Sequence, residues 1–150
     1  MVIILNYTYA KVLKIRFSSG NFIVRDYNFL GGLTMKDVRA MAEATSKGMA
    51  DFAANKPEIA QGFGQFAGAV LSDGAVDLKT KELIAVGIAA FSRCEYCIVG
   101  HVNNAFKAGC TKEEILEAAG VAIAFGGGPA SAYVATTLMD AVNEFEKDYK

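Results

Sequence analysis

Helix start and stop signals punctuate the chain from Thr34 to its C-terminus. Each segment combines a capping residue or a first-turn proline with an apolar run, and most segments end at a glycine or a turn sequence. The predicted helices span 36–54, a stretch beginning at Pro57, 77–91, 92–108, 111–125 and 129–147. This pattern predicts an all-α domain over residues 35–150.

Side chains suited to capping mark most of these starts. Thr34 is predicted to cap the first helix, with Asp37 at the capping-box position, and Asp77 to cap the third. Ser92–Glu95 and Thr111–Glu114 both have the sequence of a capping box. New helices are therefore expected to begin at the serine and at the threonine of these two motifs.

A glycine-rich stretch, residues 126–129, interrupts the last third of the chain with the sequence Gly-Gly-Gly-Pro. Its spacing matches neither dinucleotide-binding nor Walker loops, so we interpret it as a helix break with Pro129 in the next first turn. The break also excludes a membrane-spanning helix over Ala118–Ala135. The other long apolar run, Leu83–Phe91, is too short to cross a bilayer. No membrane association is therefore expected.

The first 34 residues differ in composition from the rest. They contain one alanine against 23 in residues 35–150, and four basic residues against one acidic residue. Ser18–Asn21 is a turn sequence between two apolar runs, which predicts a short β-hairpin. Alternatively, Met35 is the true start and residues 1–34 are a non-native leader. Neither interpretation gives this segment a function.

Composition and charge narrow the class of protein. Apolar residues make up 53% of the chain and charged residues 21%, which excludes a disordered chain and predicts subunit interfaces. A net charge of −1 without a basic stripe argues against nucleic acid as a partner. The N-terminus lacks the features of a signal peptide, so a cytoplasmic protein is expected. There, three cysteines are redox, metal or core residues rather than a disulfide framework.

The chemically distinctive segment is 94–97, with the sequence Cys-Glu-Tyr-Cys, followed by the single histidine, His101. On the predicted helix, Cys94 lies in the first turn, where free N–H groups and the helix dipole favour a thiolate. At about 100° per residue, Cys97 and His101 share its face. This arrangement suits attack on a peroxide to give a sulfenic acid, which the second thiol resolves into a disulfide while the imidazole exchanges the proton.

Glu82 directly precedes Leu83–Phe91, a run of residues that are all non-polar. Its neighbours at helical spacing are apolar, and a carboxylate in such surroundings is costly unless it has a partner. Because a break near Ser92 separates two sequential helices, Glu82 is expected to fold back beside the dithiol and join a proton relay. The alternative is an ordinary first-turn acid beside Lys79 and Lys81.

Two nearby residues have simpler interpretations. Cys110 follows a glycine at a predicted helix end and is expected to be a small apolar filler of the core. Tyr96, between the two cysteines, is expected to pack against neighbours rather than to catalyse.

Five residues occur with the spacing E-x11-C-x2-C-x3-H-x7-G, namely Glu82, Cys94, Cys97, His101 and Gly109. This pattern resembles the signature of the alkylhydroperoxidase D-like branch of the carboxymuconolactone decarboxylase family. The resemblance covers about residues 35–150 and is strongest over residues 78–125. The first 34 residues lie outside it.

The resemblance implies a helical bundle that assembles into homo-trimers or homo-hexamers, and a thiol-dependent peroxidase or disulfide oxidoreductase activity. By that analogy Cys97 is the peroxidatic thiol, and Cys94 is the proton donor and the resolving or partner-linking thiol. Glu82 and His101 form the proton relay. The implied partners are a small hydroperoxide and a thiol or dithiol reductant, with no cofactor and no metal. The best-known peroxidase members have a second histidine where this chain has Tyr96.

Two other functions remain open at this stage. A lactone decarboxylase, as in the family's other branch, uses a general acid–base pair and needs no thiols. A non-catalytic zinc-binding assembly module would use Cys94, Cys97, His101 and Cys110 as ligands. However, structural zinc sites usually join separate elements, and three of these residues lie on one predicted helix.

Overall fold

The computed structural model describes residues 13–17, 20–24 and 36–150, and the chain divides into two units, Met1–Thr34 and Met35–Lys150. In the first unit, β1 (Leu13–Phe17) and β2 (Gly20–Val24) pair antiparallel. They correspond to the two arms of the predicted hairpin. The predicted capping residue Thr34 lies outside the described residues.

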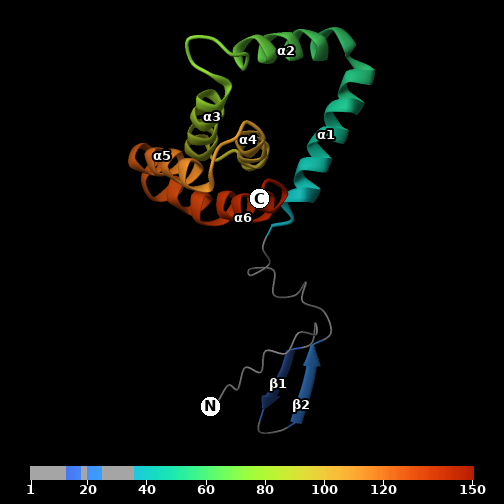
Figure 1. The fold of residues 1–150 in the computed structure, drawn as a ribbon. Coiled ribbons are helices and arrows are strands. Elements are labelled where there is room, and N and C mark those ends of the chain that lie inside the picture. The colour runs from blue at the N-terminus through green and yellow to red at the C-terminus, as the bar shows by residue number, and fades with distance from the viewer. Residues whose placement is uncertain (1–12, 18–19, 25–35) are drawn as a thin grey trace. The chain divides into compact units, whose positions relative to one another are not determined.

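Every regular element in the described part of the second unit is a helix, as predicted (Figure 1). Its elements are α1 (Val38–Asn55), α2 (Pro57–Val70), α3 (Leu78–Ser92), α4 (Glu95–Lys107), α5 (Lys112–Tyr133), a π-helical segment (Val134–Leu138), α6 (Met139–Phe145) and a short 3-10 turn (Glu146–Asp148). Pro57 occupies the first turn of α2, and Asp77 caps α3 through the N–H of Thr80, both as expected. The capping box of Thr111 and Glu114 at the start of α5 is also confirmed.

Two of the predicted helix starts are wrong by a few residues. Asp37 caps α1, accepting a hydrogen bond from the N–H of Ala40, and α1 begins at Val38. At the other site, Ser92 is not a cap but the last residue of α3. The chain turns at Arg93, whose φ of 60° is left-handed, and Cys94 becomes the cap of α4.

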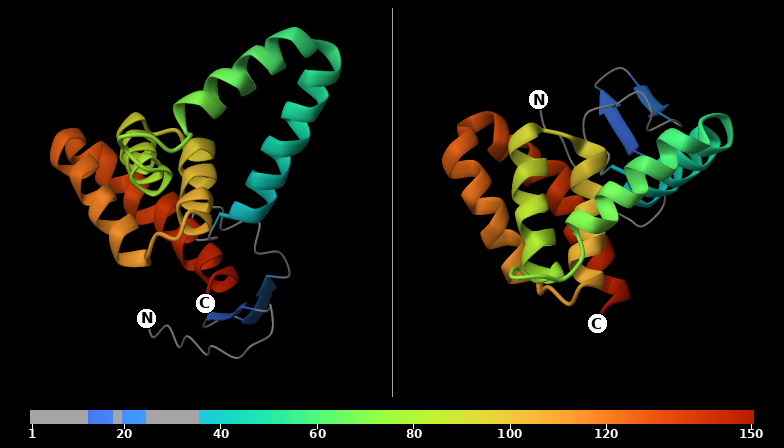
Figure 2. Two further views of the ribbon diagram at one scale, coloured as in Figure 1. Left: turned by 45° about the horizontal axis from the view of Figure 1, so that its top comes forward. Right: turned by 90° about the horizontal axis from the view of Figure 1, so that it is seen from above.

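The core lies where α3, α4, α5 and α6 pack together (Figure 2). It is built from small and branched side chains, including Val86, Ala90, Ile98, Val102, Ile115, Ala119, Leu138 and Val142. α4 contributes a continuous buried face and contacts α1, α3 and α6. The core therefore holds α3 and α4 side by side, and these are the helices that carry the predicted site residues.

By its length and composition alone, the stretch Lys112–Asp148 is long and apolar enough to cross a membrane. It is not a straight helix, however, because Gly127 has φ 58° and ψ −146°, a conformation that interrupts α5 where the sequence predicts a break. Its inner face packs into the core through residues such as Ile115 and Leu138. Lys112–Asp148 therefore forms part of the helical bundle.

α1 and α2 form an arm that projects from the bundle (Figures 1 and 2). Only the start of α1 is anchored: Val38 is buried, and Arg39 forms ion pairs with Glu144 and Asp148 at the end of the chain. Beyond this first part of α1, most residues of the arm are exposed. Within the described residues, none of α2's side chains is buried.

Candidate functional site

The two cysteines of the predicted site lie at the N-terminus of α4. Cys94 caps the helix, and its Sγ accepts a hydrogen bond of 3.3 Å from the backbone N–H of Cys97 in the first turn. The two sulfur atoms are joined in a disulfide. Cys97 is exposed and Cys94 is half-buried. Their backbone positions therefore allow a dithiol to close into a disulfide at a helix N-terminus, where N–H groups stabilise negative charge on sulfur.

Glu82 and His101 meet across the interface between α3 and α4. The Oε2 atom of Glu82 lies 2.8 Å from Nδ1 of His101. The Glu82 residue is only 3% exposed, and His101 is half-buried at the edge of the core. Because a carboxylate can only accept, an ionised Glu82 fixes the imidazole proton on Nδ1 and leaves Nε2 free to exchange a proton.

The pair of Glu82 and His101 is one helical turn from the disulfide. His101 follows Cys97 by four residues on α4, so the two side chains emerge from neighbouring positions on the same side of the helix. The structure thus brings together Glu82, Cys94, Cys97 and His101, with α3 supplying the acid and α4 the rest. The alternative was an ordinary first-turn acid beside Lys79 and Lys81, but the Glu82 carboxylate is buried and contacts His101.

Sequence reasoning missed an ion pair beside the cysteines. The Nζ atom of Lys36 pairs with Oε1 of Glu95, the residue directly after Cys94, and donates a 3.0 Å hydrogen bond to the buried Oγ1 of Thr137. The backbone N–H of Lys36 also donates to Asp140. These contacts tie the start of α1 to the first turn of α4. No local pattern predicts them, because Lys36 and Glu95 are 59 positions apart.

Cys110 does not belong to this cluster. It follows the C-terminal end of α4, whereas Cys94 caps the N-terminal end, and a helix of 13 residues is about 20 Å long. The thiol is buried, lies 3.7 Å from the carbonyl oxygen of Lys79, and has its pKa raised, chiefly by burial. The described residues contain no group of three or more potential ligands that could hold a metal ion. The four-ligand zinc alternative is therefore wrong, and Cys110 is a core residue.

Tyr96 is more exposed than a packing role predicts. Its side chain lies in the first turn of α4 between the two cysteines and is largely open to solvent. It therefore does not fill the core.

A family model for the carboxymuconolactone decarboxylase family matches residues 57–140, more than half of the chain. The protein belongs to the carboxymuconolactone decarboxylase family. The matched range contains Glu82, Cys94, Cys97 and His101.

Several relatives have been solved or sequenced. This carboxymuconolactone decarboxylase family protein is similar to a family member from Legionella pneumophila at 37% identity, with a TM-score of 0.68, over 75% of this chain and 97% of that one. It also resembles a Thermotoga maritima family member at 25% identity, with a TM-score of 0.55, over 67% and 94% of the two chains. The description of that protein mentions an antioxidative response.

The curated relatives have names that give no activity. The "Uncharacterized protein 4 in cox locus" of Paracoccus denitrificans is 42% identical over 76 residues, which are 49% of this chain and 68% of that protein. An uncharacterised protein of Cupriavidus necator is 35% identical over 77 residues, 50% and 68% of the two chains. The chemistry of this family member must therefore be argued from its own site.

Proposed function

We propose that the protein is a thiol-dependent peroxidase and disulfide oxidoreductase of the carboxymuconolactone decarboxylase family. The observation that carries this proposal is the juxtaposition of a Cys94–Cys97 disulfide at the start of α4 with a buried Glu82–His101 pair one turn further along. A decarboxylase needs the acid–base pair but not the two sulfurs. A dithiol oxidoreductase uses all four side chains.

In the oxidative steps, the proton of the Cys97 thiol passes to Nε2 of His101, directly or through water, while Glu82 stabilises the imidazolium. The Cys97 thiolate attacks the terminal oxygen of a hydroperoxide, so an S–O bond forms as the O–O bond breaks. The leaving alkoxide takes the proton back from His101 and departs as an alcohol. Cys97 is then a sulfenic acid, oxidised by two electrons.

Cys94 resolves this intermediate. Its thiol loses a proton and its sulfur attacks Sγ of Cys97, forming the disulfide as the S–O bond breaks, and the hydroxide leaves as water. The hydrogen bond from the Cys97 N–H to Cys94 Sγ supports this role, because it stabilises negative charge on the attacking sulfur. The disulfide is the form of the dithiol that has lost two electrons, and those electrons have reduced the O–O bond of the hydroperoxide to an alcohol and water.

A dithiol reductant restores the enzyme. The resemblance implies that Cys94 is the resolving or the partner-linking thiol, and exposure favours the resolving role. Since Cys97 is exposed and Cys94 is half-buried, we propose that the reductant's thiolate attacks Cys97 and that Cys94 leaves as the thiolate held at the helix N-terminus. The second thiol of the reductant then closes its own disulfide and releases Cys97. A reducing cytoplasm, the compartment that we propose for this protein, supplies such dithiols.

Peroxide consumption tests this function directly. Reduced protein is mixed with cumene hydroperoxide and dithiothreitol, and loss of peroxide is followed for the wild type and for single serine variants. We expect Cys97→Ser to abolish turnover and Cys94→Ser to accumulate a sulfenic acid that dimedone traps on Cys97. The matched control is Cys110→Ser, which should retain activity because Cys110 lies beyond the other end of α4. Full activity of Cys97→Ser would overturn the assignment.

The same variants address lactone decarboxylation, which the Glu82–His101 pair alone would favour. Decarboxylation of a carboxylated muconolactone is measured for the wild type and for a variant with Cys94 and Cys97 both replaced by serine. Decarboxylation that survives this double replacement, without peroxide turnover by the wild type, would favour the lactone decarboxylase over the oxidoreductase.

A further inference from the structure

A lysine far from the cysteines in sequence brings a positive charge to the first turn of α4. The Nζ atom of Lys36 forms an ion pair with Oε1 of Glu95, the residue directly after Cys94. The same ammonium group donates a 3.0 Å hydrogen bond to Oγ1 of Thr137. The two side chains of the ion pair are 36% and 35% exposed, so water screens the pair only in part. Charges in this position act on their neighbours more strongly than fully exposed charges do.

The hydrogen-bond acceptor for Lys36 is built into the core. Thr137 belongs to the π-helical segment Val134–Leu138 and is completely buried. Turns of π-helix are rare and are frequently found at functional sites. The backbone N–H of Lys36 donates a second bond, of 3.0 Å, to Oδ2 of Asp140 on α6. Contacts with two further elements therefore hold the lysine in place beside Glu95.

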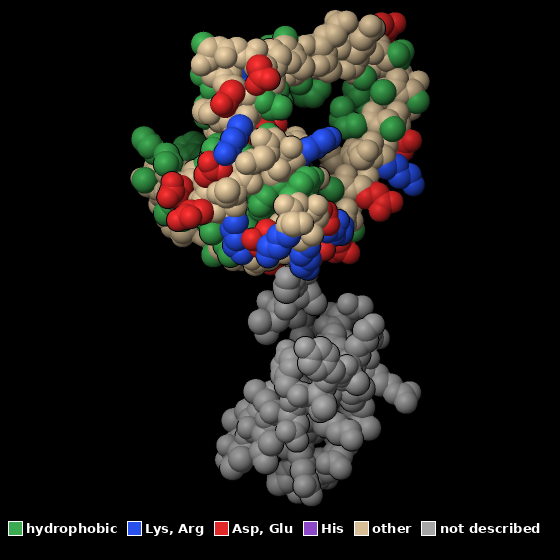
Figure 3. All heavy atoms as spheres, viewed as in Figure 1, with side chains coloured by type: hydrophobic (Ala, Val, Ile, Leu, Met, Phe, Trp, Pro, Cys, Tyr) green, Lys and Arg blue, Asp and Glu red, His purple; other side chains and the backbone are tan. Residues whose placement is uncertain are grey.

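Other charged groups of this region are engaged with one another. Figure 3 shows acidic and basic side chains gathered over α6 and the end of the chain. On α1, Arg39 forms its ion pairs with Glu144 and Asp148. Among the described residues, Lys36 is the cation that pairs with Glu95.

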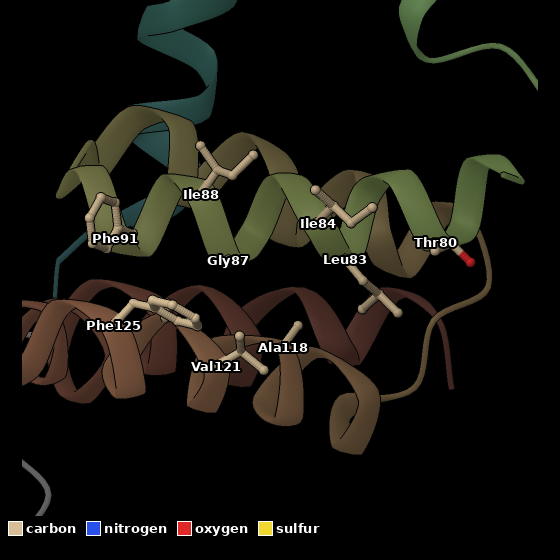
Figure 4. Close-up of a pocket in the computed structure, with 10 residues that line it drawn as sticks. Thr80, Leu83, Ile84, Gly87, Ile88, Phe91, Ala118, Val121 and Phe125 are labelled. Carbon is tan, nitrogen blue, oxygen red and sulfur yellow. The ribbon is translucent and has the colours of Figure 1, made fainter.

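The other neighbours of this turn add few charges. α3 contributes Glu82, which contacts the histidine of α4. The run that follows it on α3 is non-polar, as Figure 4 shows along the groove between α3 and α5. Arg93, directly before Cys94, is exposed. The charge near the Cys94 sulfur is therefore set by this arginine and by the balance between Glu95 and Lys36.

We propose that Lys36 is a positioning residue that neutralises Glu95 and thereby controls how readily Cys94 leaves as a thiolate when the disulfide is reduced. A carboxylate without a cation, on the residue next to Cys94, would oppose negative charge on its sulfur. The ammonium group held against that carboxylate removes the opposition. The inference rests on the proposed function, because it concerns the regeneration step of that cycle.

The step in question is reduction by a dithiol such as dithiothreitol. A thiolate of the reductant attacks Sγ of Cys97, so a new S–S bond forms as the Cys94–Cys97 bond breaks. The electron pair of the broken bond leaves on Sγ of Cys94, which then takes a proton from solvent. The second thiol of the reductant attacks the mixed disulfide, closes the reductant's own disulfide and releases Cys97. Because a more stable leaving thiolate speeds the first attack, the charge beside Cys94 should affect both the rate and the equilibrium of reduction.

Two single variants should change the rate in opposite directions. In Lys36→Met the Glu95 carboxylate loses its cation, so reduction by dithiothreitol at neutral pH should be roughly threefold to tenfold slower than in the wild type. In Glu95→Gln the cation stays and the anion is lost, so reduction should be faster by a similar factor. Samples of the full chain are quenched with iodoacetamide, and mass spectrometry counts the reduced thiols. Added salt should shrink both differences.

The double variant, with Lys36→Met and Glu95→Gln together, separates an effect of charge from an effect of architecture. It removes both charges, so its reduction rate and its redox equilibrium with glutathione should return to within about twofold of the wild type. If the ion pair only tied the start of α1 to α4, both single variants would break the same tie and change the rate in the same direction. That result, or a double variant no closer to the wild type than Lys36→Met, would overturn the proposal.

Lys79→Met is the matched control. Lys79 pairs with Glu114 at a similar exposure, but it lies in the first turn of α3, whereas Cys94 follows the last turn of that helix. Its replacement should leave the reduction rate unchanged. An effect as large as that of Lys36→Met would overturn the proposal, because it would show that any lost cation has the same result.

Further measurements cover misfolding and failure of the proposed function. Circular dichroism checks the fold of each variant. If Lys36→Met does not fold, Glu95→Gln and Lys36→Arg carry the test: the first should be reduced faster than the wild type and the second at the same rate, and the opposite result for either would overturn the proposal. None of these assays contains peroxide. A wild type without peroxide turnover would therefore overturn the proposed function, whereas single variants that change the reduction rate in the same direction would overturn only the role of Lys36.

Discussion

The carboxylate of Glu82 and the imidazole of His101 lie 2.8 Å apart, although 19 positions separate them in the chain and they belong to different helices. Glu82 is buried, and burial of a carboxylate costs free energy unless a hydrogen-bond partner replaces water. The contact with His101 provides that partner. The contact also fixes which nitrogen of His101 can exchange protons. This contact places an acid–base pair one helical turn from the two cysteines, which gives the site a group that can exchange protons.

Replacing Glu82 by Gln should therefore lower peroxide turnover while leaving the fold intact. The amide preserves the size of the side chain but not the charge that stabilises the imidazolium, and loss of an acid–base group typically costs a factor of about 100 to 10,000 in rate. The measurement is kcat/KM for cumene hydroperoxide, with circular dichroism as the check on folding. The exposed Glu117→Gln on α5 is the matched control. Equal loss in both variants would contradict a specific role for Glu82.

Cys110 should resist alkylation in the folded, reduced protein. It is 5% exposed, and burial raises the pKa of its thiol, so little thiolate is available to react. After reduction, iodoacetamide at about pH 8 should label Cys97 and Cys94 and leave Cys110 unmodified until denaturant is added. Peptide mass spectrometry gives the labelling of each cysteine. Equal labelling of all three without denaturant would refute this prediction.

The raised pKa of Cys110 also sets the sign of a pH effect. A thiol whose folded-state pKa exceeds its unfolded value favours the folded state below the unfolded pKa, near 9.0, and this contribution is lost as the pH rises through the folded pKa. The wild type should therefore lose more thermal stability than Cys110→Ala between about pH 8 and pH 11. Parallel losses in calorimetry would show that the thiol does not contribute.

Gly127→Ala should destabilise the protein by about 1–3 kcal/mol, because a Cβ is strained at φ 58° and ψ −146°. The neighbouring Gly128 provides a matched control: it has no positive φ, and a Cβ there meets nothing within 4 Å, so Gly128→Ala should be close to neutral. Urea unfolding gives both values. If the two variants unfold at the same urea concentration, the kink at Gly127 is not a constrained feature of the fold.

Acid should weaken the junction between α3 and α5. Glu114 accepts hydrogen bonds from Nζ of Lys79 and from the backbone N–H of Thr111, and these hold the pKa of its carboxyl below the usual 4.5. A depressed folded-state pKa means that the stabilisation is present above the unfolded pKa and is lost as the pH falls through the folded one. Between about pH 6 and pH 3, the unfolding temperature of Glu114→Gln should therefore fall less than that of the wild type.

The exposed Glu113→Gln is the control for this pH series. Glu113 has no ion-pair partner among residues 36–150, so its replacement should leave the acid dependence of the wild type unchanged. If Glu113→Gln flattens the profile as much as Glu114→Gln does, the acid sensitivity arises from net charge and not from the contacts with Lys79 and Thr111.

Most of the helical architecture was predictable because its signals are local. Pro57, Asp77 and Thr111 act on backbone groups within four residues, so their positions alone locate helix starts. The predicted helix start at Ser92 was wrong because two residues could cap the next helix, Ser92 and, two positions later, Cys94. Signals along the chain did not distinguish between them. In the structure α3 continues through Ser92 and ends at the left-handed Arg93, so that Cys94 caps α4.

Three features were predictable from the order of the residues alone: the helical fold, the neighbouring positions of Cys94, Cys97 and His101 at the start of one helix, and the need of Glu82 for a partner. Helical periodicity and capping depend only on neighbours along the chain, which is why these features can be read without coordinates. That His101 is the partner of Glu82 follows from the packing of α3 against α4. The arrangement of the helices also sets which apolar surfaces the bundle buries and which it leaves uncovered, because both depend on how separate helices pack in space.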